Sequence, residues 1–240
     1  MAINVDTVYK TVLLILNKEQ RGYMTPEEFN KTAAQVQLEI FEKYFEDLNQ
    51  INRTRQDGSD YSDRLAYLDQ KISIFKSEGE TTEIEAEEGE TINKKIKLLP
   101  EDLHVLGSVT SKGIEVQRVL KNEYYNLIKS DLTKPNNNFP VYVLQGKQIQ
   151  AYGVSTTLDI DYIRKPVNPE WNYREGSVGQ FLFNPVGSDD NPSVNFELHG
   201  SEQTELVLKI LIYAGVIVKD PGVVQVAASQ VQKMETNQKS

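Results

Sequence analysis

The sequence has 240 residues, with 26 Lys and Arg against 35 Asp and Glu, so its formal net charge is −9. An acidic chain is a poor candidate for wrapping nucleic acid, because sequence-independent binding to phosphates depends on Lys and Arg. The lack of cysteine excludes disulfide scaffolds, Cys-ligated zinc, iron–sulfur clusters and thiol catalysis. His104 and His199 are the only histidines, which also excludes a histidine-rich metal site. The length fits one large domain or two small ones.

Two segments of the sequence indicate whether the chain is exported or crosses a membrane. Residues Met1 to Asp6 lack the positively charged start of a signal peptide. The longest apolar run, Leu206 to Val218, is too short to cross a bilayer. We therefore expect no export signal and no membrane partner.

Residues 1–78 are expected to form a helical domain of about three helices. Apolar residues at helical spacing predict a first helix that begins near Val5 and stops at Gly22. The second helix is predicted to start at Thr25, which is a good N-cap and forms a capping box with Glu28. Its apolar stripe extends to residue 51, and a third helical pattern covers residues 62–76.

Residues 79–164 are expected to form an antiparallel β-meander with an acidic hairpin. Alternation with period two over residues 81–86 and 91–98 predicts a hairpin that turns at Glu88-Gly89. Further strands are predicted at 105–110, 114–120, 141–144, 148–152 and 157–163, with a short helix at 122–130.

The last 76 residues divide into an excursion and a helical end. Residues 165–200 contain four prolines and are expected to form an ordered but irregular, arm-like excursion. Residues 201–240 are expected to hold a helix from 201 to 219, capped by Ser201 or Gly200, and a second at 223–234 before a fraying tail. Helical periodicity at both ends and alternation in the middle favour the α+β class, with an N-terminal helical bundle, the central meander and C-terminal helices.

The aromatic residues of the excursion are candidates for an interface, because aromatic side chains commonly anchor one chain to another. A small satellite core under a loop is the alternative interpretation. The interface candidates are Trp171, Tyr173, Phe181 and Phe183, together with Val223 and Val224 near the C-terminus.

Seven glutamates lie between Glu78 and Glu90 and form a candidate cation or contact surface. A divalent-cation loop needs ligands at fixed spacing around a tight turn. This run alternates like a solvated hairpin instead, so we expect no metal and no cofactor. The candidate contact residues of the acidic hairpin are Glu83, Glu85, Glu87 and Glu88. Lys94, Lys95 and Lys97 follow closely enough to pair across it.

Enzymatic motifs are missing, since the sequence holds no phosphate-binding loop, zinc-peptidase motif or nucleophile elbow. Asp159 and Asp161 share one face of a predicted strand, and such a pair can act as acid and base in glycoside hydrolysis. The alternative is a polar strand face. The triplet at 189–191 fits a turn, and His104 and His199 fit ordinary hydrogen-bonded side chains. These motifs therefore give no sequence support to catalysis.

Several short segments together carry a resemblance to a known family. They are the opening amphipathic helix, Tyr23 to Asn30 with the helix behind it, Leu98 to Leu103, Asp161 to Pro166, Pro169 to Trp171, Glu205 to Val207, Ala214 to Val216 and Asp220. The chain resembles the head–tail connector or adaptor proteins of tailed bacteriophages, which sit under the portal. It looks most like the small structural proteins of short-tailed, crAss-like phages, and more distantly like tail tubular proteins of the A type. The acidic hairpin around Glu88 departs from the family pattern.

This resemblance implies a structural protein of the virion that is not an enzyme, located at the phage neck and present in the host cytoplasm during assembly. The implied partners are the portal, other neck and tail ring proteins, and further copies of the chain in a ring of twelve. DNA would pass through the lumen without specific binding, because an excess of negative charge repels it. The alternatives are another virion adaptor or binding module that uses the acidic hairpin, and a virion-associated glycan hydrolase.

Overall fold

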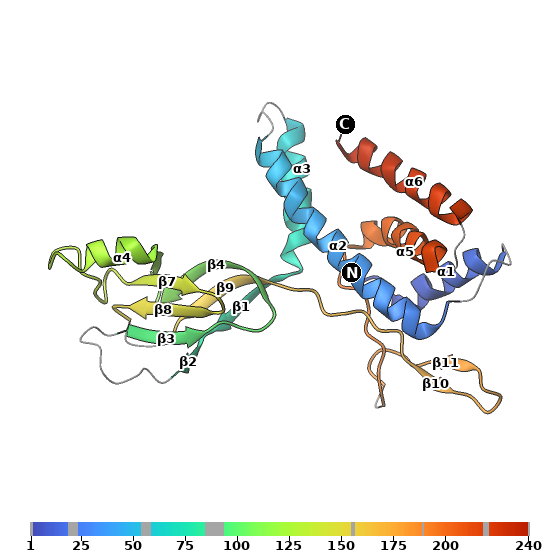
Figure 1. Cartoon of the computed structure of the whole chain (residues 1–240), viewed down its shortest axis with the longest axis horizontal. Coiled ribbons are helices and arrows are strands. Elements are labelled where there is room, and N and C mark those ends of the chain that lie inside the picture. The colour runs from blue at the N-terminus through green and yellow to red at the C-terminus, as the bar shows by residue number, and fades with distance from the viewer. Residues whose placement is uncertain are drawn as a thin grey trace. The chain divides into compact units, whose positions relative to one another are not determined.

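The chain is described by a computed structural model that covers residues 2–18, 24–53, 59–84, 94–154, 157–188, 190–217 and 221–239. Its contacts divide it into two compact units (Figure 1). Met1–Ile74 and Pro166–Ser240 together form the first, which we call the helical unit, and Phe75–Lys165 form the second, which we call the β unit. The excursion after residue 165 therefore belongs with the N-terminal helices.

The three predicted N-terminal helices are present as α1 (Val5–Lys18), α2 (Pro26–Arg53) and α3 (Ser59–Ser73). The start of α2 forms the predicted capping box. Thr25 Oγ1 accepts a hydrogen bond from the Glu28 backbone N–H at 3.3 Å, and a Glu28 carboxylate oxygen accepts one from the Thr25 N–H at 2.8 Å. These two bonds satisfy backbone donors that the first turn leaves without helical partners. The Glu28 carboxylate accepts from both the Thr25 N–H and the Thr25 hydroxyl, and these bonds hold the pKa of Glu28 below its usual range.

The core of the helical unit lies where α1 and α2 meet the C-terminal helices α5 (Gln203–Ile217) and α6 (Pro221–Lys239) (Figure 1). Helix α5 contacts α1, α2 and α6 and is therefore covered on several sides. This explains why its own apolar residues are distributed around the helix and are not confined to one face. The side chains that fill this core are fully or almost fully buried; they include Val8, Val12, Phe29, Ile40, Phe41, Leu206, Ile210 and Ala214.

Two buried ion pairs tie the start of α5 to the N-terminal helices. Lys43 Nζ lies 3.0 Å from a carboxylate oxygen of Glu205, and Lys71 Nζ lies 2.5 Å from Glu202. Burial raises the pKa of the Tyr44 hydroxyl, and the charges of these two glutamates raise it further. The C-terminal helix was expected to be capped by Ser201 or Gly200. Instead, a short 3₁₀ turn (Gly200–Glu202) precedes α5, and its cap is His199, whose Nδ1 accepts a hydrogen bond from the Ser201 N–H.

The β unit is built from two sheets. The first has the strand order β1-β9-β4-β5 and the second the order β2-β3-β8-β7-β6. The strands of the first sheet are β1 (Lys76–Glu80), β4 (Leu103–Ser111), β5 (Ile114–Glu115) and β9 (Asp159–Arg164). Those of the second are β2 (Thr82–Ile84), β3 (Lys94–Leu98), β6 (Gln117–Arg118), β7 (Val141–Gln145) and β8 (Gln148–Tyr152).

The two sheets share an apolar core. Val109 and Ile160 from the first sheet cluster with Tyr142, Ile149 and Ala151 from the second. Successive side chains of a strand point to opposite faces, so the other face of β7 and β8 carries a second cluster. There the short helix α4 (Lys121–Leu127) packs its Tyr124 ring on Tyr152, with ring centroids 3.8 Å apart.

The expected α+β class is confirmed, with helices at both ends and largely antiparallel sheets between them. Three details differ. Residues 76–80, which begin at the predicted end of the third helix and for which no strand was predicted, form strand β1, which pairs with the distant β9. The strand order is not a plain meander, since β9 lies between β1 and β4, and β6 pairs with β7 in parallel. The excursion contains a hairpin of β10 (Tyr173–Glu175) and β11 (Phe181–Phe183).

Candidate functional site

The excursion is held on the helical unit by amide side chains of α2. Asn30 Oδ1 accepts a hydrogen bond from the Trp171 backbone N–H at 2.8 Å, and Asn30 Nδ2 donates to the Trp171 carbonyl at 3.3 Å. Gln37, which is 1% exposed, donates to the Val167 carbonyl at 2.7 Å and accepts from the Glu197 N–H at 3.0 Å. The two amides are seven residues apart and so lie on one face of α2, two turns from each other. They fix both the outgoing and the returning chain of the excursion.

Trp171 is the anchor of this segment. Its indole Nε1 donates a hydrogen bond to Asp6 Oδ1 at 3.1 Å, and its ring lies 4.4 Å from the Tyr9 ring, centroid to centroid. Only 4% of Trp171 is exposed. The structure therefore places this interface candidate in a small satellite core, the alternative that its sequence context left open.

The aromatic residues that follow Trp171 form a continuous row. The centroids of Tyr173 and Phe183 lie 5.9 and 5.8 Å from that of Trp171, and Phe181 lies 4.4 Å from Tyr173. In the β10–β11 hairpin Tyr173 is opposite Phe183 and Glu175 is opposite Phe181, so these four side chains share one face. These ring contacts connect the hairpin to the buried Trp171 and so hold it in place.

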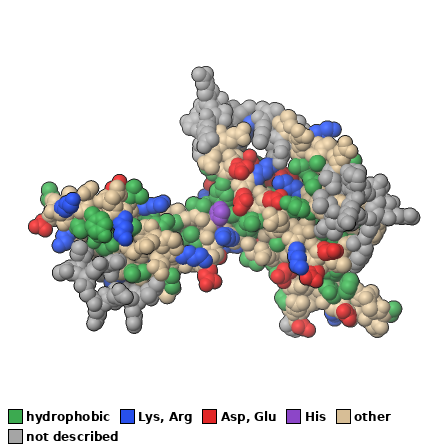
Figure 2. All heavy atoms as spheres, in the orientation of Figure 1, with side chains coloured by type: hydrophobic (Ala, Val, Ile, Leu, Met, Phe, Trp, Pro, Cys, Tyr) green, Lys and Arg blue, Asp and Glu red, His purple; other side chains and the backbone are tan. Residues whose placement is uncertain are grey.

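The outer part of the hairpin leaves large apolar side chains exposed (Figure 2). The exposed fractions are 37% for Tyr173, 40% for Phe181 and 38% for Leu182, and they rise to 87% for Val178. A groove of about 480 Å³ lies between the hairpin and α1; its walls are Tyr9, Lys10, Leu13, Trp171, Gln180 and Phe181. An anchored, apolar ribbon beside a groove is a surface suited to contact with another protein.

Helix α6 contains the other two interface candidates, Val223 and Val224, but their side chains lie outside the described residues. Among the described positions of α6, Val226 is 60% exposed and Ala227 is buried.

The acidic hairpin is described only at its base. In the backbone register Glu83 of β2 is opposite Lys97 of β3, and Lys97 is fully buried; the side chain of Glu83 lies outside the described residues. Glu85, Glu87 and Glu88 lie outside the described residues. No group of three or more acidic or histidine side chains within the described ranges is arranged to hold a metal ion.

The outer face of the first sheet also carries exposed carboxylates. Glu78 and Glu80 of β1 lie opposite Asp161 and Asp159 of β9, and all four side chains are exposed. Directly opposed like charges destabilise a strand pair. Glu78 and Asp161 also line a cavity of about 490 Å³ together with Lys76 and Val105. The face is thus an exposed, strongly acidic surface of the β unit.

Asp159 and Asp161 lie on this open face as a pair of neighbours on one strand. The Ser108 hydroxyl donates a hydrogen bond to the Asp161 carboxylate. The general acid of a glycosidase needs an environment that keeps its carboxyl protonated near neutral pH, usually by burial. Neither aspartate is buried, so the geometry lends no support to acid–base catalysis by this pair.

The surroundings of the remaining candidates, two histidines and the predicted turn, indicate structural roles. His199 caps the start of the 3₁₀ turn before α5, and its ring packs edge-on against Tyr67 at 5.9 Å. His104 lies on β4 and is partly buried. Asn191 has a φ of 45°, and its carbonyl accepts a hydrogen bond from Asn184 Nδ2 at 2.8 Å, which fits the predicted turn.

A scan against protein-family models gives no match, and a search of the curated proteins gives none either. Within the described part of the chain, no helix combines the length and the apolar character that spanning a membrane requires.

Proposed function

We propose that this chain is a structural protein of a tailed-phage virion that forms a ring at the neck, links the portal to the tail and extends the DNA conduit. The observation that carries the proposal is the β10–β11 hairpin, whose exposed apolar side chains are held by the buried Trp171 anchor. A ring needs surfaces of this kind, because each copy must bind its neighbour through a patch that is already ordered.

The charge of the chain supports the same proposal. A net charge of −9 opposes tight binding to DNA phosphates, which is what a conduit requires. The resemblance in sequence to head–tail connector proteins points to the portal as the first partner, and to twelve copies in the ring.

The test is a light-scattering measurement of mass at two protein concentrations, for the chain alone and mixed with portal rings from the same phage. We expect the chain alone to stay small and the mixture to contain a complex heavier than the portal ring by several copies. If the mass of the chain is unchanged by the portal at both concentrations, the neck assignment is refuted.

A second candidate is a virion adaptor or binding module that makes contact through its acidic surface. The observation that favours it is the set of four exposed carboxylates on β1 and β9, next to the strand that leads into the acidic hairpin. Deleting the whole hairpin would also remove β2, which pairs with β3. The sharper test changes the exposed Glu78 and Glu80 of β1, together with Glu85, Glu87 and Glu88, to Gln. Loss of portal binding in that variant favours the acidic contact, and unchanged binding favours the hairpin β10–β11.

A further inference from the structure

Two exposed apolar surfaces stand out, one in each unit. The first, which we call the hairpin surface, consists of Tyr173 and Phe181, which share one face of the β10–β11 hairpin, and Val178 in its turn. The second, which we call the α4 surface, comes from helix α4 and the segments on either side of it in the sequence; its residues are Leu120, Tyr125, Leu132 and Phe139. Leu132 is 93% exposed and Val178 is 87% exposed, the two highest values among large apolar side chains of the described residues. Such surfaces on a folded protein usually mark contacts with another chain.

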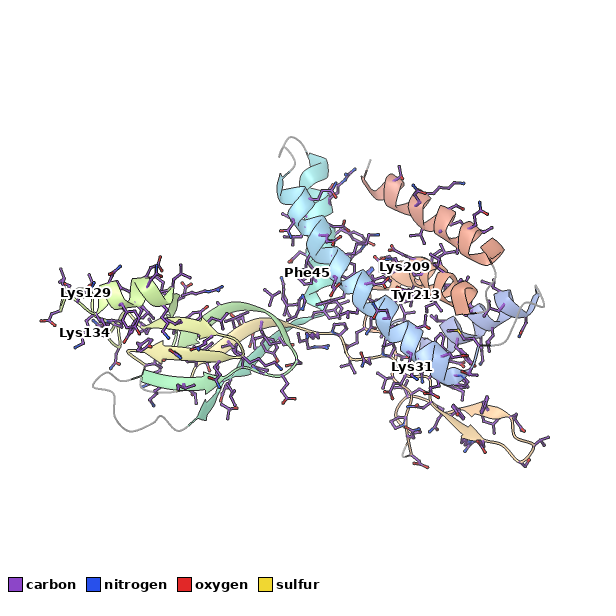
Figure 3. All side chains as sticks on the ribbon, in the orientation of Figure 1. Lys31, Phe45, Lys129, Lys134, Lys209 and Tyr213 are labelled. Atoms are coloured by element: carbon purple, nitrogen blue, oxygen red, sulfur yellow. The ribbon has the colours of Figure 1, made fainter. Side chains whose placement is uncertain are left out.

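The two surfaces carry opposite charge. The segment from 118 to 139 around α4 holds four basic residues against two acidic ones; the basic ones are Arg118, Lys121, Lys129 and Lys134, all exposed. Figure 2 shows Lys and Arg side chains beside apolar ones at this end of the β unit, and Figure 3 labels Lys129 and Lys134. The segment from 166 to 198 around the hairpin holds five acidic residues against the single base Arg174. Glu170, Glu175 and Asp190 of that segment are exposed.

Charge decides which pairing is favourable. Contact between two hairpin surfaces, or between two α4 surfaces, would bring like charges together around an apolar centre, and like charges across an interface oppose binding. Contact between a hairpin surface and an α4 surface brings opposite charges around the same apolar centre. Because the two surfaces differ, such a contact is heterologous and can repeat from copy to copy.

We infer that the hairpin surface of one copy docks on the α4 surface of the next copy of this chain, head to tail. Val178 and Phe181 are the apolar side chains that the hairpin contributes, and Leu132 and Phe139 are their counterparts. This inference rests on the proposed function, since it supplies the copy-to-copy contact that a neck ring needs.

Site-directed cross-linking tests the contact directly, because the natural chain has no cysteine. Val178→Cys and Leu132→Cys each place one thiol at a highly exposed position, where the substitution leaves the core untouched. The full-length variants are mixed, treated with a short bis-maleimide and analysed by denaturing gel. Lys31→Cys, at an exposed position of α2 that belongs to neither surface, is the control partner (Figure 3).

The head-to-tail contact predicts a specific pattern. The mixture of Val178→Cys and Leu132→Cys should give a covalent dimer, each variant alone should give little, and a chain with both cysteines should give a ladder of multimers. The yield should exceed that with the Lys31→Cys control by at least about tenfold. Dimers of a single variant with itself, or yields no higher than the control both with and without portal rings, would overturn the inference.

Charge reversal separates a specific contact from random collision. Lys129→Glu with Lys134→Glu on the Leu132→Cys chain should lower the cross-linking yield by about tenfold at low salt, because the reversed surface repels the acidic hairpin. Glu175→Lys with Asp190→Lys on the Val178→Cys chain should restore the yield toward its original value. A yield that ignores both reversals would contradict the assigned charge complementarity.

The inference and the proposed function can fail separately. Portal binding without the cross-link would remove head-to-tail docking and leave the neck assignment in place. The cross-link without any portal binding would keep the docking contact and remove the neck assignment.

Discussion

Replacement of Asn30 by alanine is the most informative perturbation of the anchored excursion. The change removes two hydrogen bonds, at 2.8 and 3.3 Å, between the Asn30 amide and the backbone of the buried Trp171. A buried peptide group that loses its partner costs about 1–3 kcal/mol, and partial exposure puts each of these at the lower end. Alanine is the better helix former by about 0.5 kcal/mol, which offsets part of the loss. We therefore expect the free energy of unfolding to fall by about 1.5 kcal/mol.

The assay is a urea titration with two signals. Trp171 is the only tryptophan, so its fluorescence reports on the excursion alone, while far-UV circular dichroism reports mainly on the helices. Because the excursion and the helices form one unit, both midpoints should move together. Gln35→Ala, at an exposed position on the same helix, should stay within about 0.5 kcal/mol of the parent. An equally small effect of Asn30→Ala would refute the anchoring role of the amide.

Three further changes test other parts of the fold. Thr25→Ala should lower the free energy of unfolding by about 1 kcal/mol, and part of this difference should be lost as the pH falls below 4.5, the ordinary pKa of a glutamate, because the Thr25 backbone and hydroxyl hold the pKa of the Glu28 carboxyl below that value. Lys71→Met should cost about 3 kcal/mol, because it leaves the buried Glu202 carboxylate without its cation, and adding Glu202→Gln should recover at least half. Gly153→Ala should cost about 3 kcal/mol, because its φ is +75° and a Cβ would lie 2.7 Å from the Asn136 carbonyl oxygen.

Each of these is measured by urea unfolding followed by circular dichroism. A stability difference for Thr25→Ala that does not shrink at all on acidification would contradict the hydrogen bond from the Thr25 hydroxyl to the ionised Glu28 carboxylate, and no difference at neutral pH would contradict the capping account. A double variant of the ion pair no more stable than Lys71→Met would contradict the assignment of the loss to an unpaired charge. Gly146→Ala is the matched control for the glycine, because its φ is +60° but nothing lies within 4 Å of the added Cβ, so it should cost only about 1 kcal/mol.

Local signals allowed much of the fold to be predicted. The start of α2 depends on Thr25 and Glu28, which are three residues apart, so neighbours in the sequence determine it. Strand β1 was missed because Lys76 to Glu80 are mostly polar and lack the alternation of apolar residues that predicts a strand. That segment is a strand because β9, about 80 residues later, pairs with it. A pairing partner so far away in the sequence cannot be recognised from the residues of the strand itself.

The candidate surface shows the same limit. Its aromatic composition identified Trp171, Tyr173, Phe181 and Phe183, but composition does not distinguish an anchor from an exposed contact. Trp171 became the anchor because Tyr9 and Asp6, more than 160 residues away in sequence, cover its ring and accept its N–H. Asn30 was missed for a similar reason: an amide on a helix surface looks like any solvated residue until the backbone it binds is placed beside it.

Native mass spectrometry of the chain mixed with portal rings tests the central claim most directly, because it counts the copies that bind. The account predicts a complex whose mass exceeds that of the portal ring by twelve copies of the 27.3 kDa chain, with few partly filled rings. A spectrum that contains only free portal and free chain, or a single bound copy per portal ring, would contradict a neck ring built by copy-to-copy contacts.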